Sequence, residues 1–259
     1  MQVNFRVAKI FAIANQKGGV GKTTTAVNLS ASLADFDKKV LLVDCDPQGN
    51  ASSGFGINKT ELTKTVYDVL INNLDAKYTL QKTPYGVTVL PANINLAGAE
   101  VELVSQIARE GKLRAALDKV RDDYDFILID CPPSLGLLTV NALNAANSVL
   151  IPIQCEFYAL EGVTQLFNTI DIVRSNLNPL LAIEGIVMTM FDSRTRLSRQ
   201  VVEEVYSNFG GLLYETLIPR SVRLSEAPSF GKPIIAYEAT SRSAEVYLNL
   251  AREVLERGK

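Results

Sequence analysis

The feature that most constrains the fold of this chain is a glycine-rich turn at residues 15–25, NQKGGVGKTTT. It lies between an apolar run of strand length and a helical segment. Gly21-Lys22-Thr23 completes the usual phosphate-loop pattern, although Gln16 stands where that pattern begins with glycine. A strand, a glycine-rich turn and a helix in this order indicate a phosphate-binding loop. The plainer interpretation is a turn that carries a solvated lysine.

Each residue type in this turn has a chemical use. Gly18, Gly19 and Gly21 let the backbone approach phosphate oxygens and turn its N–H groups inward, and the helix that follows adds the positive end of its dipole. We expect Lys22 to contact the β- and γ-phosphates and the Thr23 hydroxyl to ligate Mg²⁺. The expected nucleotide-binding residues of the loop are Lys17, Gly18, Gly19, Val20, Gly21, Lys22, Thr23 and Thr24.

The loop has a second lysine, Lys17, which precedes the glycines. A lysine on this rising limb cannot easily curl back to phosphates that Lys22 already contacts. It can reach a nucleotide held by a second subunit docked face to face. The alternative is that Lys17 is an ordinary surface lysine.

Apolar runs alternate with helical segments along the rest of the chain. Continuous apolar runs suit strands covered on both faces, and this alternation predicts an α/β fold: a mainly parallel twisted sheet with helices on both faces. No linker divides the chain, so residues 1–259 are expected to form a single domain. The expected strands are residues 9–14, 39–43, 87–90, 126–129, 149–153, 183–188 and 213–218, and the expected helices are residues 23–33, 113–119, 137–146, 160–175, 199–207 and 243–257.

Three aspartates stand at the carboxyl ends of expected strands, where ligands bind in parallel sheets. Asp44 and Asp46 are two residues apart in "VDCDPQ", so both carboxylates point to the same side of an extended chain. Asp130 ends the apolar run "FILID" before two prolines. A strand-end pair can also merely cap the next turn, but a phosphate loop nearby favours a role at the nucleotide.

Composition excludes several functions. The formal charge is −2, so any binding to nucleic acid must come from a local patch. The sequence contains no histidine, which removes the usual neutral-pH general base. Cys45, Cys131 and Cys155 are widely separated, and we interpret them as reduced and not bound to metal. The apolar run at the N-terminus, in "MQVNFRVAKIFAIAN", is too short and too interrupted for a signal peptide or a membrane span.

"KGGVGKTT" resembles the deviant Walker A motif of the ParA/MinD family of P-loop ATPases. The resemblance implies an ATP- and Mg²⁺-dependent enzyme whose first lysine, here Lys17, reaches across an ATP-sandwich dimer. It implies that Asp46 positions the attacking water and that Asp44 supports the site and the metal shell. "DYDFILIDCPPS" matches the family's Walker B and second switch, so the resemblance makes Asp130 a Mg²⁺-shell residue. The implied catalytic residues are Lys17, Lys22 and Asp46, and the implied metal residues are Thr23, Asp44 and Asp130.

The C-terminal third is similar to the chromosomal ParA branch, often called Soj, in "MTMFDSRTRLSRQVVEEV" and "IPRSVRLSEAPSFGKPI". Because the chain starts almost at its first strand, we expect no N-terminal helix-turn-helix domain. MinD, a membrane-recruited positioning ATPase, is the alternative, but the tail has mixed charges and an apolar face suited to packing, so no membrane partner is expected. A third possibility is an Fe–S protein related to the nitrogenase iron protein, with Cys131 as a cluster ligand.

The resemblance also implies partners. The family places DNA-contacting arginines where Arg194 and Arg223 stand, and both lie in stretches without acids. Pro219 and Arg220 fall in the loop that packs on adenine in relatives. We therefore expect non-specific binding of double-stranded DNA by an ATP-dependent homodimer, at the nucleoid in the cytoplasm. A centromere-binding partner of the ParB/Spo0J type would stimulate hydrolysis and so end the bound state.

Overall fold

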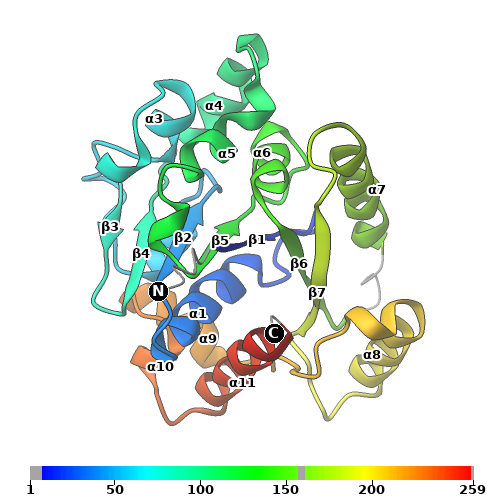
Figure 1. Cartoon of the computed structure of the whole chain (residues 1–259). Coiled ribbons are helices and arrows are strands. Elements are labelled where there is room, and N and C mark those ends of the chain that lie inside the picture. Colours follow the sequence, from blue (N-terminus) through cyan, green and yellow to red (C-terminus); the bar gives the residue numbers. More distant parts are fainter. Residues whose placement is uncertain (1–7, 157–160, 258–259) are drawn as a thin grey trace, which may run out of the picture.

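The computed structural model describes residues 8–156 and 161–257, which form one twisted sheet of seven strands covered by helices on both faces (Figure 1). The strand order is β3-β4-β2-β5-β1-β6-β7. All neighbouring strands pair in parallel except β3, which pairs antiparallel with β4 at one edge. The strands are β1 (Lys9–Ile13), β2 (Val40–Asp44), β3 (Gln81–Lys82), β4 (Val87–Leu90), β5 (Phe126–Asp130), β6 (Ser148–Gln154) and β7 (Ala182–Thr189).

Helices connect the strands and form two layers. In Figure 1, α3 to α7 lie above the sheet, whereas α1, α9, α10 and α11 lie below it. The α-helices are α1 (Lys22–Asp35), α2 (Asn50–Gly54), α3 (Val66–Ile71), α4 (Leu96–Glu102), α5 (Lys112–Leu117), α6 (Leu137–Ala145), α7 (Glu161–Asn176), α8 (Arg196–Phe209), α9 (Val222–Glu226), α10 (Ile234–Tyr237) and α11 (Arg242–Arg257).

The alternation of side chains along each strand divides the core in two. In β1, Ile10 and Ala12 join the cluster beneath α3 to α7, while Phe11 and Ile13 join the cluster with α1 and α11. Because both faces of the sheet are buried, the strands are apolar at consecutive positions, and this explains why continuous rather than alternating apolar runs predicted them. The parallel order also brings the carboxyl ends of β1, β2, β5, β6 and β7 to one edge.

The mainly parallel α/β prediction is confirmed, with one expected strand wrong. Residues 213–218 run beside β7, but the bridge from Leu213 to Ile186 is isolated, and a second isolated bridge joins Phe191 to Pro219 just beyond both segments. The backbone N–H groups of Glu215 and Thr216 instead donate to the Glu253 carboxylate on α11, at 2.8 and 3.1 Å. A side chain of α11 therefore accepts two backbone hydrogen bonds from this segment, and the segment does not pair as a strand.

Several short elements were not predicted: β3, α2, α3, α4, α9 and α10. The first residue of the expected helix at 160–175 lies outside the described residues, and α7 covers the remainder. The expected apolar face of the last helix is confirmed: Tyr247, Leu250, Ala251 and Val254 of α11 are buried in the core cluster that contains α1, and Leu255, the fifth residue expected on this face, packs against it partly buried.

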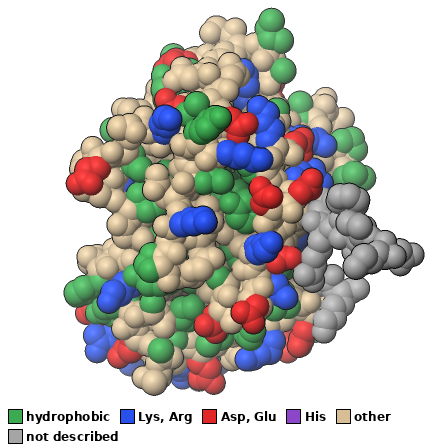
Figure 2. Space-filling view, turned by 60° about the vertical axis from the view of Figure 1, so that its left-hand side comes forward, with side chains coloured by type: hydrophobic (Ala, Val, Ile, Leu, Met, Phe, Trp, Pro, Cys, Tyr) green, Lys and Arg blue, Asp and Glu red, His purple; other side chains and the backbone are tan. Residues whose placement is uncertain are grey.

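Charged groups are mixed over the molecular surface drawn in Figure 2, where Lys and Arg side chains alternate with Asp and Glu. This face shows no broad field of one sign, which agrees with the small net charge. Within the described residues, no helix has the length and apolar character needed to cross a bilayer.

Candidate functional site

The glycine-rich turn leaves β1 and leads directly into α1, as predicted. Gly19 and Gly21 have φ of 75° and 88°, a backbone conformation that favours glycine. Gly21 is the N-cap of α1, and no side chain caps the helix there. The first N–H groups of a 14-residue helix are therefore available to an anion at the end of β1.

Lys22 points into the same space from the first turn of α1. The residue is only 6% exposed, and its Nζ donates to the carbonyl oxygen of Lys17 at 3.0 Å. Burial lowers the pKa of the Lys22 ammonium, and the negative charge of Asp130 offsets part of that effect. A buried ammonium with one carbonyl partner has donors to spare, because a lysine carries three N–H groups.

Asp130, at the end of β5, is completely buried, and neither of its carboxylate oxygens has a hydrogen-bond partner among the described residues. Burial raises the pKa of this carboxyl group well above its ordinary range, and the neighbouring Asp44 raises it further. The nearby Thr23 hydroxyl, although outside hydrogen-bond geometry, and then the Lys22 ammonium lower the pKa. An unpaired buried carboxylate is costly, so these oxygens need a cation or a proton.

Asp44 ends β2 directly opposite Asp130 in the sheet register. Its carboxylate accepts from the Ser52 N–H at 2.8 Å, from the Ser52 hydroxyl at 2.7 Å and from the Asp46 N–H at 3.2 Å. Burial raises the pKa of Asp44 to about 6, against the effect of these hydrogen bonds. Asp44 therefore fixes the turn that holds Asp46 and the start of α2.

Asp46 lies in that turn and is 9% exposed. One of its oxygens accepts from the Gln48 N–H at 2.9 Å. The two carboxylates, which both precede Pro47, thus have different surroundings: Asp44 is enclosed by donors, whereas Asp46 retains acceptor capacity.

The sequence interpretation missed Thr189, which ends β7. Its hydroxyl lies 2.8 Å from the Val20 carbonyl of the loop and 3.2 Å from the Ile153 carbonyl of β6. Thr189 thus ties the phosphate loop to two strands. Its position at a strand's carboxyl end was the signal that could have identified it.

A cavity of about 560 Å³ opens beside the loop, between α1, α2 and the segment after β7. Pro219 and Arg220, the residues predicted to bind the base, line this cavity. Met190 lines it too, with a φ of 53° that is unusual for a residue other than glycine. Its lining also includes Thr23, Thr24, Asn28, Ser53 and Lys232.

The two expected DNA-contacting arginines lie outside this cavity and are exposed. Arg194 pairs with Asp192 at 2.8 Å, while Arg223 pairs with Glu226 at 2.9 Å and with Glu238 at 3.2 Å. Exposed pairs of this kind contribute little energy, so they constrain the arginines only weakly. The stretches at residues 193–200 and 216–225 contain no acid, but Asp192 and Glu226 stand directly beside them in the sequence and take up the two arginines, and folding adds Glu238 next to Arg223.

A parallel sheet with a glycine-rich turn before α1 and aspartates on adjacent strand ends defines a P-loop nucleotide-binding protein. A family profile described as AAA domain matches residues 8–183. The sporulation initiation inhibitor protein Soj of Bacillus subtilis is 58% identical over 253 residues, which cover 97% of this chain and 100% of Soj. The chromosome partitioning protein ParA of Myxococcus xanthus is 57% identical over 252 residues, 97% of this chain and 89% of ParA. The chain belongs to the ParA/Soj family of chromosome-partitioning ATPases.

A solved structure extends the comparison to bound nucleotide. Cobyrinic acid a,c-diamide synthase from Mycobacterium smegmatis, with a bound ATP analog and magnesium, has a TM-score of 0.85 and 39% sequence identity to this chain. The match covers 97% of this chain and 96% of that protein.

Proposed function

We propose that this chain is a partition ATPase that forms a homodimer around two ATP molecules and binds double-stranded DNA without sequence preference in that state. A centromere-binding partner of the ParB type stimulates hydrolysis and returns it to monomers. The observation that supports this proposal best is the buried, unpaired Asp130 carboxylate beside Lys22 and the open N-terminus of α1.

The phosphates occupy the space in front of α1. N–H groups of Gly18, Gly19 and Gly21 surround them, and the Lys22 ammonium exchanges its bond to the Lys17 carbonyl for the β- and γ-phosphates. Pro219 and Met190 line the cavity that takes the base. Because the protein itself buries Lys22, this ammonium loses little further solvation when it binds phosphate.

The residues present fit a magnesium ion. Asp130 offers two unsatisfied oxygens and Thr23 a hydroxyl, and hard oxygen donors are the ligands that Mg²⁺ prefers. Within the described parts of the chain, no cluster of three or more His, Cys, Asp or Glu side chains forms a protein-only metal cage. Mg²⁺ bound with a nucleotide usually needs only one or two carboxylates besides phosphates and water. When bound, it neutralises charge on the phosphate oxygens.

Hydrolysis needs a water molecule held in line with the terminal phosphate. Asp46 orients this water, since one of its oxygens is held by the Gln48 N–H and acceptor capacity remains. Asp44 positions Asp46 through the bond from its N–H. Lys17 of each protomer approaches the phosphates of the other, so ATP stabilises the dimer because its charge contacts both subunits.

A membrane-recruited, MinD-like function is less well supported. The apolar face of α11 is buried against the core that contains α1, so these side chains are not available to a bilayer. We therefore propose DNA at the nucleoid, in the cytoplasm, as the surface on which this ATPase acts.

The proposal is tested with an Asp46→Ala variant and the wild-type chain. With ATP and Mg²⁺, Asp46→Ala should elute as a dimer and retain ATP, because the phosphate contacts remain while the water loses its orientation. ATPase activity of the wild type is measured alone, with DNA, and with DNA plus the N-terminal segment of a ParB partner. Activity that DNA and partner together do not raise, or a variant that stays monomeric with ATP, would refute the proposed cycle.

A further inference from the structure

A second pocket, of about 290 Å³, lies between the loop after β7, the segment at residues 219–221 and the first turn of α11. Each of the three segments contributes one arginine and one serine to its lining. These six residues are Arg194, Arg220, Arg242, Ser193, Ser221 and Ser243.

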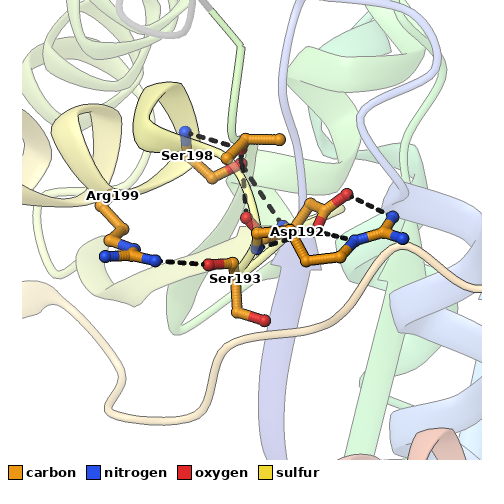
Figure 3. Close-up of polar contacts among 6 residues, drawn as sticks. Asp192, Ser193, Ser198 and Arg199 are labelled. Carbon is orange, nitrogen blue, oxygen red and sulfur yellow. Dashed lines mark hydrogen bonds and ion pairs between the residues drawn. The ribbon is translucent and has the colours of Figure 1, made fainter.

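The loop that brings Arg194 to this pocket is held in place by α8. Figure 3 shows Arg199 reaching back from α8 to the Ser193 carbonyl oxygen, a hydrogen bond of 2.7 Å. The Ser198 hydroxyl of the same helix accepts from the Asp192 N–H at 3.3 Å. A loop fixed in this way loses little conformational freedom when it binds a ligand.

The three arginines differ in how far acids neutralise them. Arg194 donates twice to Asp192, from Nε at 2.9 Å and from Nη2 at 2.8 Å. Arg220 pairs with Glu156 at 3.2 Å. Arg242 has no ion pair within the described part of the chain. It stands at the first position of the 16-residue helix α11, where the helix dipole adds positive potential.

This pocket is adjacent to the nucleotide cavity but separate from it. Pro219, Arg220 and Ser221 line both, so this segment forms their common wall. Arg194 and Arg242 line the second pocket, which we call the basic pocket, and do not line the nucleotide cavity. Arg242 is therefore the residue whose substitution tests the pocket without altering a nucleotide contact.

We propose that this pocket binds a backbone phosphate of nucleic acid, with Arg242 as its principal free cation. The assignment rests on the proposed DNA-binding function and adds a residue to it. Three guanidinium groups and three hydroxyls provide donors for phosphate oxygens, and such contacts fix register without reading sequence. The pocket holds one carboxylate, that of Asp192, and Arg194 already pairs with it.

The test compares DNA affinity against salt concentration for Arg242→Gln and its parent, both locked in the ATP dimer by Asp46→Ala. Each dimer has two copies of the pocket, so the variant loses two phosphate contacts. The slope of log affinity against log salt should fall in magnitude by about 1.8, at about 0.9 per contact. The advantage of the parent should grow about twelvefold as salt drops from about 200 to about 50 mM.

Two further variants act as controls. Arg252→Gln removes the same charge from the same helix, and Arg252 lies outside the pocket, bonded to Asn249 at 2.7 Å. It should keep the parent slope. Arg242→Lys preserves the charge and should therefore retain most of the parent's salt slope. ATP affinity by calorimetry and the melting temperature should match the parent in all three variants.

The outcomes separate this inference from the function on which it rests. If the locked dimer binds no DNA at low salt, the proposed DNA-binding function fails and the pocket assignment falls with it. If the dimer binds DNA but Arg242→Gln keeps the parent slope, the pocket alone is wrong. If Arg252→Gln lowered the salt slope as much as Arg242→Gln does, the effect would be one of general charge, and the pocket assignment would be overturned. Inorganic phosphate is a second probe: heat of binding that vanishes in Arg242→Gln, without any change in DNA affinity, would overturn the nucleic-acid assignment.

Discussion

The Nζ atom of Lys17 lies 3.9 Å from the Oε2 atom of Glu156, so the extra lysine of the loop is paired within its own chain. The other oxygen of the same carboxylate pairs with Arg220. Glu156 follows the carboxyl end of β6, and it thereby joins the phosphate loop to the wall between the nucleotide cavity and the basic pocket. A lysine that acts on the nucleotide of a second protomer has to leave this carboxylate first.

Glu156→Gln should therefore favour the ATP dimer. The pair is exposed, with side chains 35% and 44% accessible, so its loss is worth at most about 1 kcal/mol, or up to about a fivefold lower dimer dissociation constant per protomer. Sedimentation equilibrium with ATP, in the Asp46→Ala background, measures this constant. Glu203→Gln on α8 is the matched control, remote from the loop. A weaker dimer in Glu156→Gln would show that Glu156 serves the interface instead.

The two lysines of the loop should have different phenotypes. Lys22→Ala removes the buried ammonium beside Asp130, so ATP binding should be lost. Lys17→Ala leaves that ammonium in place, so the monomer should bind ATP while dimer formation and turnover fail. A charge supplied in trans can be worth about 10³–10⁵ in rate. Calorimetry for binding and a phosphate-release assay for turnover distinguish the two. Normal turnover in Lys17→Ala would mean that the second lysine does not act on the phosphates.

Gly231→Ala should destabilise the fold near the nucleotide cavity. Gly231 has φ of 62°, and an added Cβ would come within 2.5 Å of the Gly56 Cα. Because the Cα of Gly56 is a backbone atom that cannot move away without distorting the chain, the loss of unfolding free energy should be about 2 kcal/mol or more. Gly211→Ala is the control, since an added Cβ meets nothing within 4 Å there. Urea unfolding of both variants checks this, and equal midpoints would contradict the close approach.

The three cysteines should be unreactive in the folded chain. All are buried, and burial raises the pKa of each thiol, that of Cys155 to about 12. Because the thiolate is the nucleophile, Cys155 should react at pH 8 roughly 10³-fold more slowly than a free cysteine of pKa near 8.5. Raising the pH toward 12 should increase its rate. Alkylation followed by mass spectrometry, with urea-unfolded chain as the reference, measures this. Fast labelling of Cys131 in the folded chain would indicate an accessible thiol, as an Fe–S ligand at a dimer interface requires.

Much of the site could be predicted from the sequence because its residues are adjacent along the chain or end strands. The loop with Lys22 and Thr23 is contiguous. Its glycines indicate a positive-φ backbone, which glycine adopts more easily than other residues. Asp44 and Asp130 each close an apolar run, and parallel strands bring such ends together. The short helix α3 was missed, although the capping box that Thr65 and Asp68 form at its start was a signal that could have identified it.

What the sequence by itself determined, then, is the set of elements and the chemistry at the ends of the strands, since both follow from local pattern and the period of side chains. Tertiary structure decided which distant groups meet. Glu253 takes the backbone donors of Glu215 and Thr216 from across 37 or more positions, and so residues 213–218 are not a strand. Thr189 reaches Val20, 169 residues away, and Arg242 reaches the pocket of Arg194. No local sequence pattern predicts these contacts, because they form only when the helices and the sheet pack together and bring distant segments side by side.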